Sequence, residues 1–598
     1  MKKYSFLSLL FVSGMVFSSC NKEFLDRYPQ TQISEENFFK TTSDLETYSN
    51  TFYSQLAFTY DDIGSDNVSS YSGGGEVNNL LAGNLTPSTV TGWDDWSNLR
   101  TVNYLLDHAS GASGDSASIN HYVGIARFFR AMFYIVKVKR YSNVPWVNHA
   151  MSNTDTALLY KPEDPRALVV DSIVSDLQYA ANNILTSKDG NRTRVTKWSA
   201  LALLSRFCLF EGTFRKYHSE VQLNDGNRFL QMSIAASQQL MASRKFQIVG
   251  SSAVDYGNLF ASSTLAGNNE IIQWQASDPS LGVGNNSHTV LGWEWALSKS
   301  LEESYLMMDG SRFTDIATHD TMGFVQVFKN RDPRLAQTFA YPGFSNSGGG
   351  VAYIAKPNLG GYDQIKYYPK DASLRGGWEL NYTGLPLFRY AEVLLNYIEA
   401  KAELGDDIAQ SDLDATVNLL RDRVAMPHMN LSVQNNMDPV LTKYYPNVTG
   451  KNQGLILEIR RERRVELACE GLRLDDLNRW YAGQRIGDAQ QGIYVKSLGG
   501  LDLTGDGLPD IAILPSVSDS SALNSLSPAQ RNNISARYYL TNSDGTSNNF
   551  YLTKSTSGNI AFTADKGTRQ FIEPKYYYRP VPLNQTVLNP KLAQPFGW

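Results

Sequence analysis

The chain has 598 residues, of which 42% are hydrophobic and 19% are charged, and its formal net charge is −5 at pH 7. This composition is sufficient for a sizeable hydrophobic core and excludes a disordered tether. The net negative charge also argues against a protein that binds nucleic acid or an anionic lipid surface, because such proteins usually carry an excess of positive charge.

The first element of the chain is a short apolar segment that ends at a cysteine. Two lysines precede a largely apolar run over residues 4–17, which is too short to span a bilayer but suits a signal-peptide core. Two serines then precede Cys20, and such a small-small-Cys junction resembles a bacterial lipobox. We therefore predict a lipoprotein signal peptide over residues 1–19 and a lipid anchor on Cys20. The alternative is an ordinary secretory peptide with an incidental cysteine.

Cys208 and Cys469 lie in apolar helical patterns and are interpreted as buried thiols.

Most of the long periodic segments predict helices, because their apolar residues recur at intervals of three and four positions. The first is predicted to begin at a capping box formed by Ser43 and Glu46. Two later helices are predicted to end at Gly212 and Gly405, since glycine commonly follows the last helical turn. The predicted helical segments cover residues 44–56, 121–141, 164–184, 197–212, 391–405, 411–426 and 455–480.

These helices come in adjacent pairs with alanines at positions of close approach, as stacked helical hairpins require. Between them lie stretches rich in Gly, Ser, Asn and Tyr over residues 61–95, 341–385 and 497–565. Such long loops on a rigid frame usually carry function. The predicted fold is therefore mainly α. Irregular tetratricopeptide-like hairpins form a right-handed superhelical scaffold with long loop-rich and minor β insertions, in a single large body.

The segment 455–480 contains glutamates at four-residue spacing among several arginines, which could suggest hydrolytic chemistry. Like charges every fourth residue repel unless partners intervene, and the arginines three or four residues away supply such partners. We interpret this segment as a structural ion-pair helix that ties neighbouring helices together. The glutamates are Glu458, Glu462, Glu466 and Glu470.

A further motif, "LDLTGDGLPD", resembles a calcium-binding loop. Odd-numbered positions of such a loop supply hard oxygen ligands that a tight turn brings together. The candidate ligands are Asp502, Thr504, Asp506, Leu508 (through its carbonyl) and Asp510. Ile513 stands where the bidentate glutamate is expected, and the flanks do not read as EF-hand helices, so an Asp/Gly turn without an ion is the alternative. The sequence thus predicts at most one structural calcium ion, and no organic cofactor.

Candidate ligand-binding side chains are aromatic and polar residues of the loops. A flat aromatic face can stack on a pyranose ring, and carboxyl and amide groups can bind its hydroxyls. Each aromatic could instead be an ordinary core residue. The candidates are Trp93, Trp293, Trp295, Trp378, Tyr382, Asp66, Asn67 and Tyr71.

Ten segments in order resemble the SusD/RagB family of Bacteroidetes surface lipoproteins, along nearly the whole chain. They include "WDDWSNLRTVNYLL", "GIARFFRAMFYIVKVKRYSNVPWV", "EIRRERRVELACEGLRLDDLNRW" and the ending "YYYRPVPLNQTVLNPKLAQPFGW". The resemblance implies a body over residues 20–598. That body has an N-terminal SusD-like part at about residues 22–250 and a C-terminal RagB/SusD part at about residues 270–598.

The resemblance also implies a function. Members of this family capture glycans, or sometimes peptides, at the outer-membrane surface and act with a SusC-like TonB-dependent transporter. No catalytic motif of the G-x-S-x-G or HExxH type occurs in the chain. We therefore expect a lipid-anchored glycan-binding protein of the outer membrane that is not an enzyme. A peptide-binding member of the family and a helical glycoside hydrolase are the alternatives.

Overall fold

The computed structural model describes residues 38–56, 58–347, 350–567 and 569–598. The predicted signal peptide and Cys20 lie outside the described residues.

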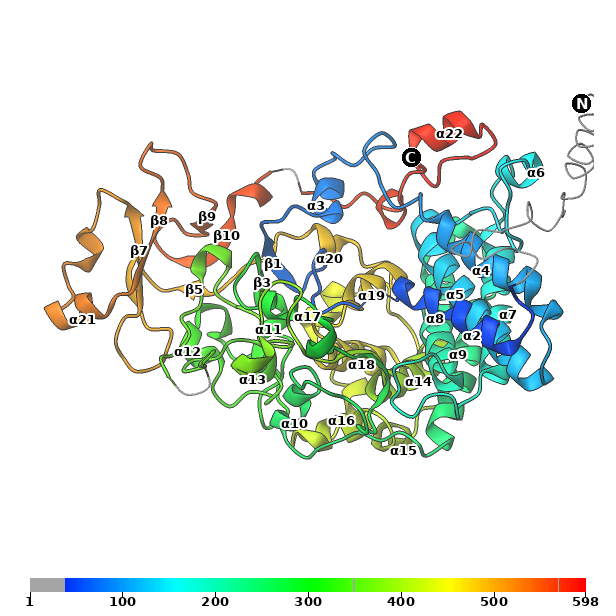
Figure 1. The fold of residues 1–598 in the computed structure, drawn as a ribbon. Helices are drawn as coiled ribbons and strands as arrows, with labels where there is room; N and C mark the ends of the chain where they lie inside the picture. The colour runs from blue at the N-terminus through cyan, green and yellow to red at the C-terminus, as the bar shows by residue number, and fades with distance from the viewer. Residues whose placement is uncertain (1–37, 57, 348–349, 568) are drawn as a thin grey trace, which may run out of the picture.

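The long helices pack on one another in series, from one end of the molecule toward its middle (Figure 1). α4 packs on α5, α5 on α7, α7 on α8, α8 on α9, α9 on α14 and α14 on α18. These helices are α4 (Trp96–His108), α5 (Ser116–Tyr141), α7 (Arg166–Asn183), α8 (Lys197–Tyr217), α9 (Gly226–Ala242), α14 (Tyr390–Leu404) and α18 (Gln453–Glu466). The prediction of a mainly helical scaffold is confirmed, whereas its superhelical handedness and the two-part division of the chain stay predictions.

Shorter helices connect the long ones or lie among the loops and strands of the rest of the molecule (Figure 1). They are α2 (Thr42–Ser49), α3 (Glu76–Leu81), α6 (Thr156–Leu159), α10 (Ala253–Asn258), α11 (Lys299–Glu302), α12 (Phe324–Val327), α13 (Leu335–Thr338), α15 (Gln410–Asp414), α16 (Val417–Arg423), α17 (Pro439–Tyr444), α19 (Arg473–Arg479), α20 (Gln484–Gly487), α21 (Pro528–Asn533) and α22 (Leu583–Leu588).

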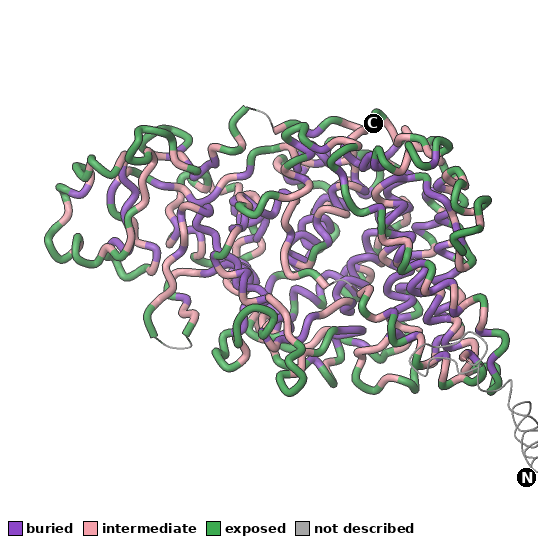
Figure 2. Tube along the Cα trace, turned by 45° about the horizontal axis from the view of Figure 1, so that its top comes forward, coloured by how far each residue is buried: buried purple, intermediate pink, exposed green. Residues whose placement is uncertain are grey.

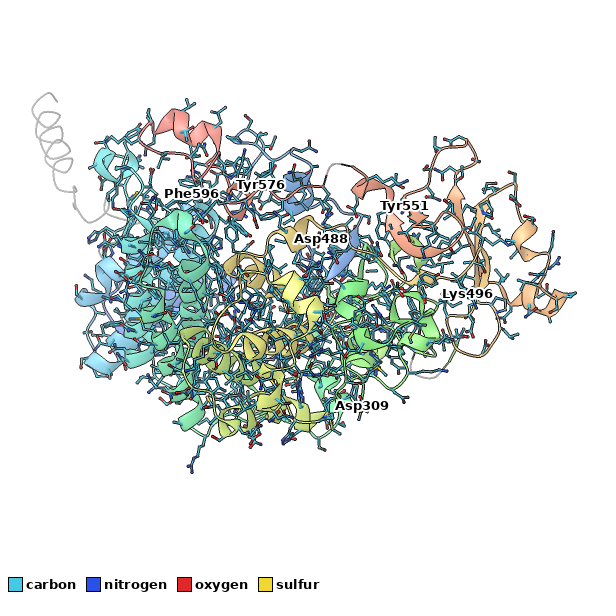
Figure 3. The ribbon with its side chains drawn as sticks, turned by 180° about the vertical axis from the view of Figure 1, so that it is seen from behind. Asp309, Asp488, Lys496, Tyr551, Tyr576 and Phe596 are labelled. Atoms are coloured by element: carbon cyan, nitrogen blue, oxygen red, sulfur yellow. The ribbon has the colours of Figure 1, made fainter. Side chains whose placement is uncertain are left out.

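Within the described residues, the strands form four small sheets, mostly in the loop-rich insertions. Two sheets are antiparallel pairs: β1 (Val68–Tyr71) with β3 (Trp295–Leu297), and β2 (Ile271–Gln275) with β4 (Leu385–Arg389). A third has the order β5 (Tyr494–Val495), β10 (Gly558–Phe562), β9 (Phe550–Leu552). The fourth has the order β6 (Gly499–Leu501), β7 (Ile511–Ser516), β8 (Ala536–Thr541), and β7 and β8 are parallel. Seen from behind, Tyr576 and Phe596 lie over the helical array, whereas Lys496 and Tyr551 lie at the strand-rich end (Figure 3).

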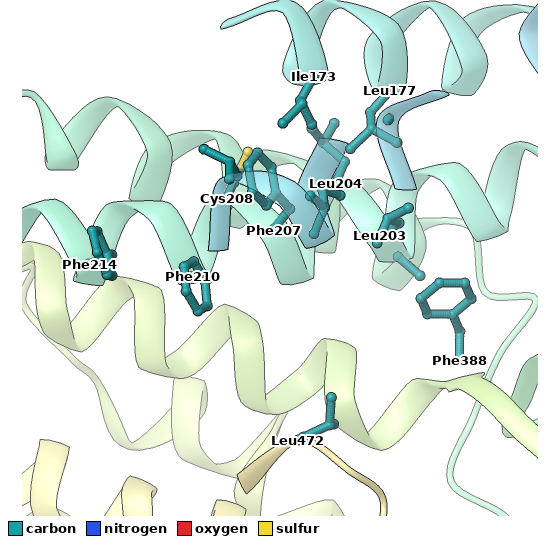
Figure 4. Packing of buried hydrophobic residues seen from close by; sticks show 14 of the residues in the cluster. Ile173, Leu177, Leu203, Leu204, Phe207, Cys208, Phe210, Phe214, Phe388 and Leu472 are labelled. Atoms are coloured by element: carbon teal, nitrogen blue, oxygen red, sulfur yellow. The ribbon is translucent and has the colours of Figure 1, made fainter. Parts of the chain in front are cut away.

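The main hydrophobic core lies inside the helical array, and exposed residues concentrate in the peripheral loops (Figure 2). Figure 4 shows part of this core, where Ile173 and Leu177 face Leu204 and Phe207. Cys208 packs in the same cluster, and burial raises the pKa of its thiol. The interpretation of Cys208 and Cys469 as buried free thiols is confirmed.

Several predicted helix boundaries were wrong, and the predicted segment 411–426 is two short helices, α15 and α16. Thr41, rather than Ser43, caps the first helix, with Asp44 as its capping-box partner, and this helix passes into a 3₁₀ turn after Ser49. α8 continues past Gly212 to Tyr217, because this glycine serves close packing instead of ending the helix. A Cβ at Gly212 would lie 2.8 Å from the Leu230 side chain of α9.

The predicted segment 455–480 is two helices, α18 and α19, separated by a turn in which Cys469 has φ 65°. Asp62, from the N-terminal part of the chain, stabilises this turn. Its carboxylate accepts hydrogen bonds from the backbone amides of Cys469 (2.6 Å) and Gly471 (3.0 Å). A tertiary contact therefore ends α18, and the helical periodicity of the sequence does not reveal it.

The glutamates of α18 are structural, as predicted, but most of their partners come from other elements. Glu462 pairs with Arg334 and Arg421, and Glu466 with Arg334, Arg389 and Arg423. These side chains are buried. The ion pairs therefore fasten α18 to the segments around it, and only Glu458 pairs mainly along its own helix, with Arg461.

Candidate functional site

Asp66 and Asn67 belong to the buried framework and do not line an open site. Asp66 accepts hydrogen bonds from Arg473 Nε (2.7 Å) and Nη2 (3.0 Å) and lies close to Arg464 and Arg485. Burial alone would raise the pKa of Asp66, but the surrounding arginines hold it well below its usual range. Asn67 accepts from Arg464 Nε at 2.8 Å. Their expected role as ligand-contacting residues is inconsistent with this burial.

Trp93 and Trp295 are also buried, so neither presents a free face to a ligand. Trp93 packs edge-on against Tyr141, with ring centroids 4.8 Å apart. Trp295 lies in β3, and its indole N–H donates to Gln364 Oε1 at 3.1 Å. For these two aromatics, the alternative interpretation as core residues is the one that the structure favours.

Trp293 and Trp378, in contrast, are 60% and 63% exposed. Trp293 directly precedes Glu294, whose backbone carbonyl accepts a hydrogen bond from Ser72 N (2.9 Å) at the end of β1. The pairing of β1 with β3 places Tyr71 opposite Trp295. Two of the predicted residues, Tyr71 and Trp293, therefore lie at the same end of this small sheet, where β1 ends and β3 begins.

Trp378 and Tyr382 lie on a second loop, which is hydrogen-bonded to residues 285–287. The amide of Glu379 donates to Asn286 Oδ1 at 2.5 Å, and Asn285 pairs with Asn381 through two backbone hydrogen bonds. A cleft of 380 Å³ opens beside this loop, with Tyr60, Asn286 and Glu379 in its wall. Tyr382 is half-buried. Trp378 therefore marks a second possible contact surface.

A more elaborate site, which we call the Tyr71 cleft, surrounds Tyr71. It measures 360 Å³ and combines side chains from distant parts of the chain. Its polar lining includes Ser70, Asn78, Asn79, Asn549, Asp565 and Arg569. Asp565 and Arg569 pair with each other at 2.9 Å, so their charges are balanced.

The local sequence explains how the Tyr71 side chain is placed. A Cβ at Gly73 would lie 2.4 Å from Tyr71 Oη, so only glycine lets the ring lie over this loop. Partial burial and the nearby carboxylates of Glu294 and Asp61 raise the pKa of Tyr71. Its phenol therefore stays protonated at neutral pH and can both donate and accept a hydrogen bond.

Asn78 and Asn79 give the cleft its clearest binding capacity. Neither side-chain amide makes a hydrogen bond within the described part of the chain, although both line the cleft. An amide offers two donors and a carbonyl acceptor, which is the combination that sugar hydroxyls and peptide groups require. With the Tyr71 ring beside them, these groups fit a neutral polar ligand that has a flat apolar face.

A second cleft, which we call the Arg579 cleft, adjoins the first. It measures 430 Å³ and lies between α3, α5, α19 and the segment around Arg579. Gly64, Tyr71 and Asn78 line both clefts, so Tyr71 forms a shared wall.

The predicted calcium loop folds as a tight connection between β6 and β7. Asp502 accepts hydrogen bonds from the amides of Gly505 (2.6 Å) and Gly507 (2.9 Å), and Asp506 accepts from that of Leu508 (2.8 Å). Buried Asp510 accepts from the backbone of residue 503 and from both the amide and the hydroxyl of residue 504. Among the residues that the structure describes, no group of three or more His, Cys, Asp or Glu side chains is placed to hold a metal ion. The carboxylates thus bind backbone amides instead of converging, and this arrangement favours the alternative of an Asp/Gly turn without an ion.

Within the described ranges, no helix is both long and apolar enough to cross a membrane.

Several residues that line the clefts were not among the candidates predicted from the sequence. Asn78 and Asn79 lie in the Gly- and Ser-rich stretch that the sequence singled out. Asn549 also lies in a stretch that the sequence singled out (497–565), and Arg579 lies in the C-terminal segment that resembles the family. Nothing local indicates that these two residues and Arg569 meet at this place, because only folding brings them together.

The comparisons with known proteins identify the family. The model of the SusD family matches residues 282–598, more than half of the chain, and the chain belongs to this family. It is 25% identical over 515 residues to SusD-like protein P2 of Formosa agariphila, which covers 81% of this chain and 92% of that protein.

Solved structures share the fold. A SusD-like protein of Bacteroides fragilis superposes with a TM-score of 0.66 at 19% identity, covering 96% of this chain and all of that one. A SusD-like carbohydrate-binding protein of the same species has a TM-score of 0.65 at 22% identity, covering 93% of this chain and all of that one. A laminarin-binding SusD-like protein has a TM-score of 0.57 at 17% identity, covering 94% of this chain and all of that one. The predicted family and the helix-rich fold are confirmed.

Proposed function

We propose that this chain is a cell-surface lipoprotein that binds an oligosaccharide in the Tyr71 cleft and delivers it to a SusC-like TonB-dependent outer-membrane transporter. The observation that carries the binding step is the pair of unpartnered amides, Asn78 and Asn79, beside an accessible tyrosine ring. The descriptions of two similar structures, one as carbohydrate-binding and one as laminarin-binding, support a glycan as the ligand class.

The delivery step and the lipid anchor rest on the family and on the N-terminal sequence. In this proposal Cys20 keeps the body at the outer membrane, and the protein acts by binding, without cleaving its ligand. A peptide-binding role is the second candidate, since amides and aromatic rings also suit a peptide backbone.

A glycan array and a peptide library, followed by calorimetry on the best ligand, test the proposal. We expect glycan binding without release of a cleaved product. Tyr71→Ala and Asn79→Ala should weaken binding, and Trp293→Ala should do so if the ligand extends past the end of β3. Loss of one aromatic stacking contact costs about 1–3 kcal/mol by analogy with base stacking, which is roughly 5- to 150-fold in affinity.

Tyr160→Ala provides the matched control, because Tyr160 is also an exposed aromatic but lies next to α6, outside both clefts. Unchanged affinity in Tyr71→Ala and Asn79→Ala, together with a loss in Trp378→Ala, would move the site to the second loop. Exclusive binding of peptides, or release of shortened glycan, would contradict the proposal.

A further inference from the structure

The Arg579 cleft differs chemically from the Tyr71 cleft that it adjoins. Its floor is apolar, with Ile63, Val77, Ile135 and Leu474 in the lining. Its rim carries charged side chains, whereas the Tyr71 cleft offers mostly uncharged amides and hydroxyls. Because Tyr71 separates the two clefts, a ligand of several rings seated in the first would extend a group into the second.

The charges of the Arg579 cleft do not cancel. Lys139 is balanced by Asp475, whose carboxylate lies 2.6 Å away. Arg140 and Arg579 share a single carboxylate, that of Glu76. Arg140 donates to both Glu76 oxygens (3.1 and 2.7 Å), and Arg579 Nε donates to Oε1 at 2.6 Å. The lining therefore carries one positive charge in excess, because it contains three cations and two anions. These residues are Lys139, Arg140, Arg579, Glu76 and Asp475.

Arg579 also retains hydrogen-bonding capacity. Its residue is only 7% exposed, and its Nη1 donates to the backbone carbonyls of Tyr576 and Tyr578. Its Nη2 makes no hydrogen bond within the described part of the chain. Arginine N–H groups favour carboxylate and sulfate oxygens, and an apolar floor weakens the screening of such a contact.

We propose that the glycan bound by this protein is acidic, and that its carboxylate or sulfate group occupies the Arg579 cleft while uncharged sugar rings occupy the Tyr71 cleft. This inference rests on the proposed function and narrows its substrate class. The net charge of the chain is −5, so a local excess of positive charge is needed to hold an anionic ligand.

The test compares oligosaccharides that share one backbone and differ only in charge: a neutral set, a uronate-containing set and a sulfated set. We expect one acidic set to bind at least about tenfold more tightly than the neutral set, by about 1.4 kcal/mol. This preference should shrink between 50 and 500 mM NaCl (roughly a threefold shorter screening length), because added salt screens the contact. Which acidic set binds decides between a carboxylate and a sulfate ester.

Substitutions at Val136 test the position of the acidic group without removing any native hydrogen bond. Val136 lies on α5, lines the Arg579 cleft and is 51% exposed. Val136→Glu should weaken binding of the acidic glycan about tenfold, whereas Val136→Lys should preserve or strengthen it. For the neutral set, Val136→Glu and Val136→Lys should have equal effects, because an uncharged group in the cleft does not distinguish the sign of the added charge. Leu168→Glu, an exposed aliphatic position on α7, is the matched control for adding a charge to a helix surface.

The outcomes separate this inference from the function on which it rests. Equal affinity for neutral and acidic sets, or identical behaviour of Val136→Glu and Val136→Lys, overturns the acidic substrate class but leaves glycan binding intact. Absence of binding to every glycan set overturns the proposed function and this inference with it.

Discussion

Asp66 has a structural role, although it lies in a loop-rich stretch that was predicted to carry function. Its carboxylate is fully buried and is surrounded by the guanidinium groups of Arg464, Arg473 and Arg485. These arginines come from α18, α19 and α20. Asp66 therefore joins the start of β1 to a part of the chain some 400 residues away in sequence.

Replacement of Asp66 by Ala should destabilise the protein strongly. Removing one partner of a buried ion pair leaves uncompensated charge, which costs about 3–5 kcal/mol. We expect a clear fall in the Tm by differential scanning calorimetry. Asp407→Ala is the control, because Asp407 is exposed and its pair with Lys451 lies in solvent. A Tm equal to that of the wild type would show that the arginines find other partners.

Glu302 gives a pH prediction at the same scale. Its Oε1 binds Arg331, its Oε2 is buried without a partner in the described chain, and burial raises its pKa to about 7 despite that arginine. A folded-state pKa above the unfolded value means that the protonated carboxyl stabilises the fold. This contribution is complete below about pH 4.5 and is lost as the pH rises through 7.

Glu302→Gln should remove this dependence. The Tm of the wild type relative to the variant should fall between pH 5 and pH 8, as measured in matched buffers. The exposed Glu379→Gln should run parallel to the wild type over the same range. Parallel curves for Glu302→Gln would contradict the assignment.

At the scale of elements, the loop between β6 and β7 illustrates why a motif has two interpretations. Its aspartates are spaced as in a calcium loop, but the same spacing lets each carboxylate accept backbone amides of a tight turn. The turn needs these hydrogen bonds whether or not an ion is present.

The two interpretations predict different responses to a chelator. If the carboxylates only support the turn, EDTA leaves the Tm unchanged, which is the result we expect from the geometry. A bound calcium ion would instead stabilise the folded state, so that EDTA lowers the Tm and added calcium restores it. Asp510→Ala should lower the Tm in both cases, because it leaves buried backbone amides without an acceptor.

At the scale of the whole molecule, the fold brings the two ends of the chain together around the clefts. Residues 63–82 form one wall, and residues 562–579 contribute another. The helical array supports both, since α5 and α19 line the Arg579 cleft. The two adjoining clefts thus lie where segments from distant parts of the sequence meet.

Attachment of this body to the membrane is predicted to depend on one residue. Cys20→Ala should abolish labelling by a radioactive fatty acid and move the protein from the membrane fraction to the soluble fraction. Cys208→Ala should keep the label, because that thiol is buried in the core and carries no lipid. A labelled Cys20→Ala variant would contradict the anchor.

The sequence by itself determined the family, the positions of most long helices and the structural role of the α18 glutamates. These features follow from local periodicity, charge spacing and ordered motifs, which are all readable along the chain. It also singled out the stretch that contains Tyr71, Asn78 and Asn79. The end of α18 could not be predicted from the sequence, because a distant carboxylate, that of Asp62, stabilises the turn that follows the helix.

Only the tertiary structure decided which candidate side chains are accessible. Trp293 and Trp295 are two residues apart and chemically identical, yet one is exposed and the other is buried in a hydrophobic cluster. Composition cannot separate them, since exposure depends on what the fold places on top of each ring. Arg569 and Arg579 could not be predicted for the same reason. Arg579 is held by Glu76, about 500 positions earlier in the chain, and the amide of Gln570, next to Arg569, donates to the carbonyl of Leu81.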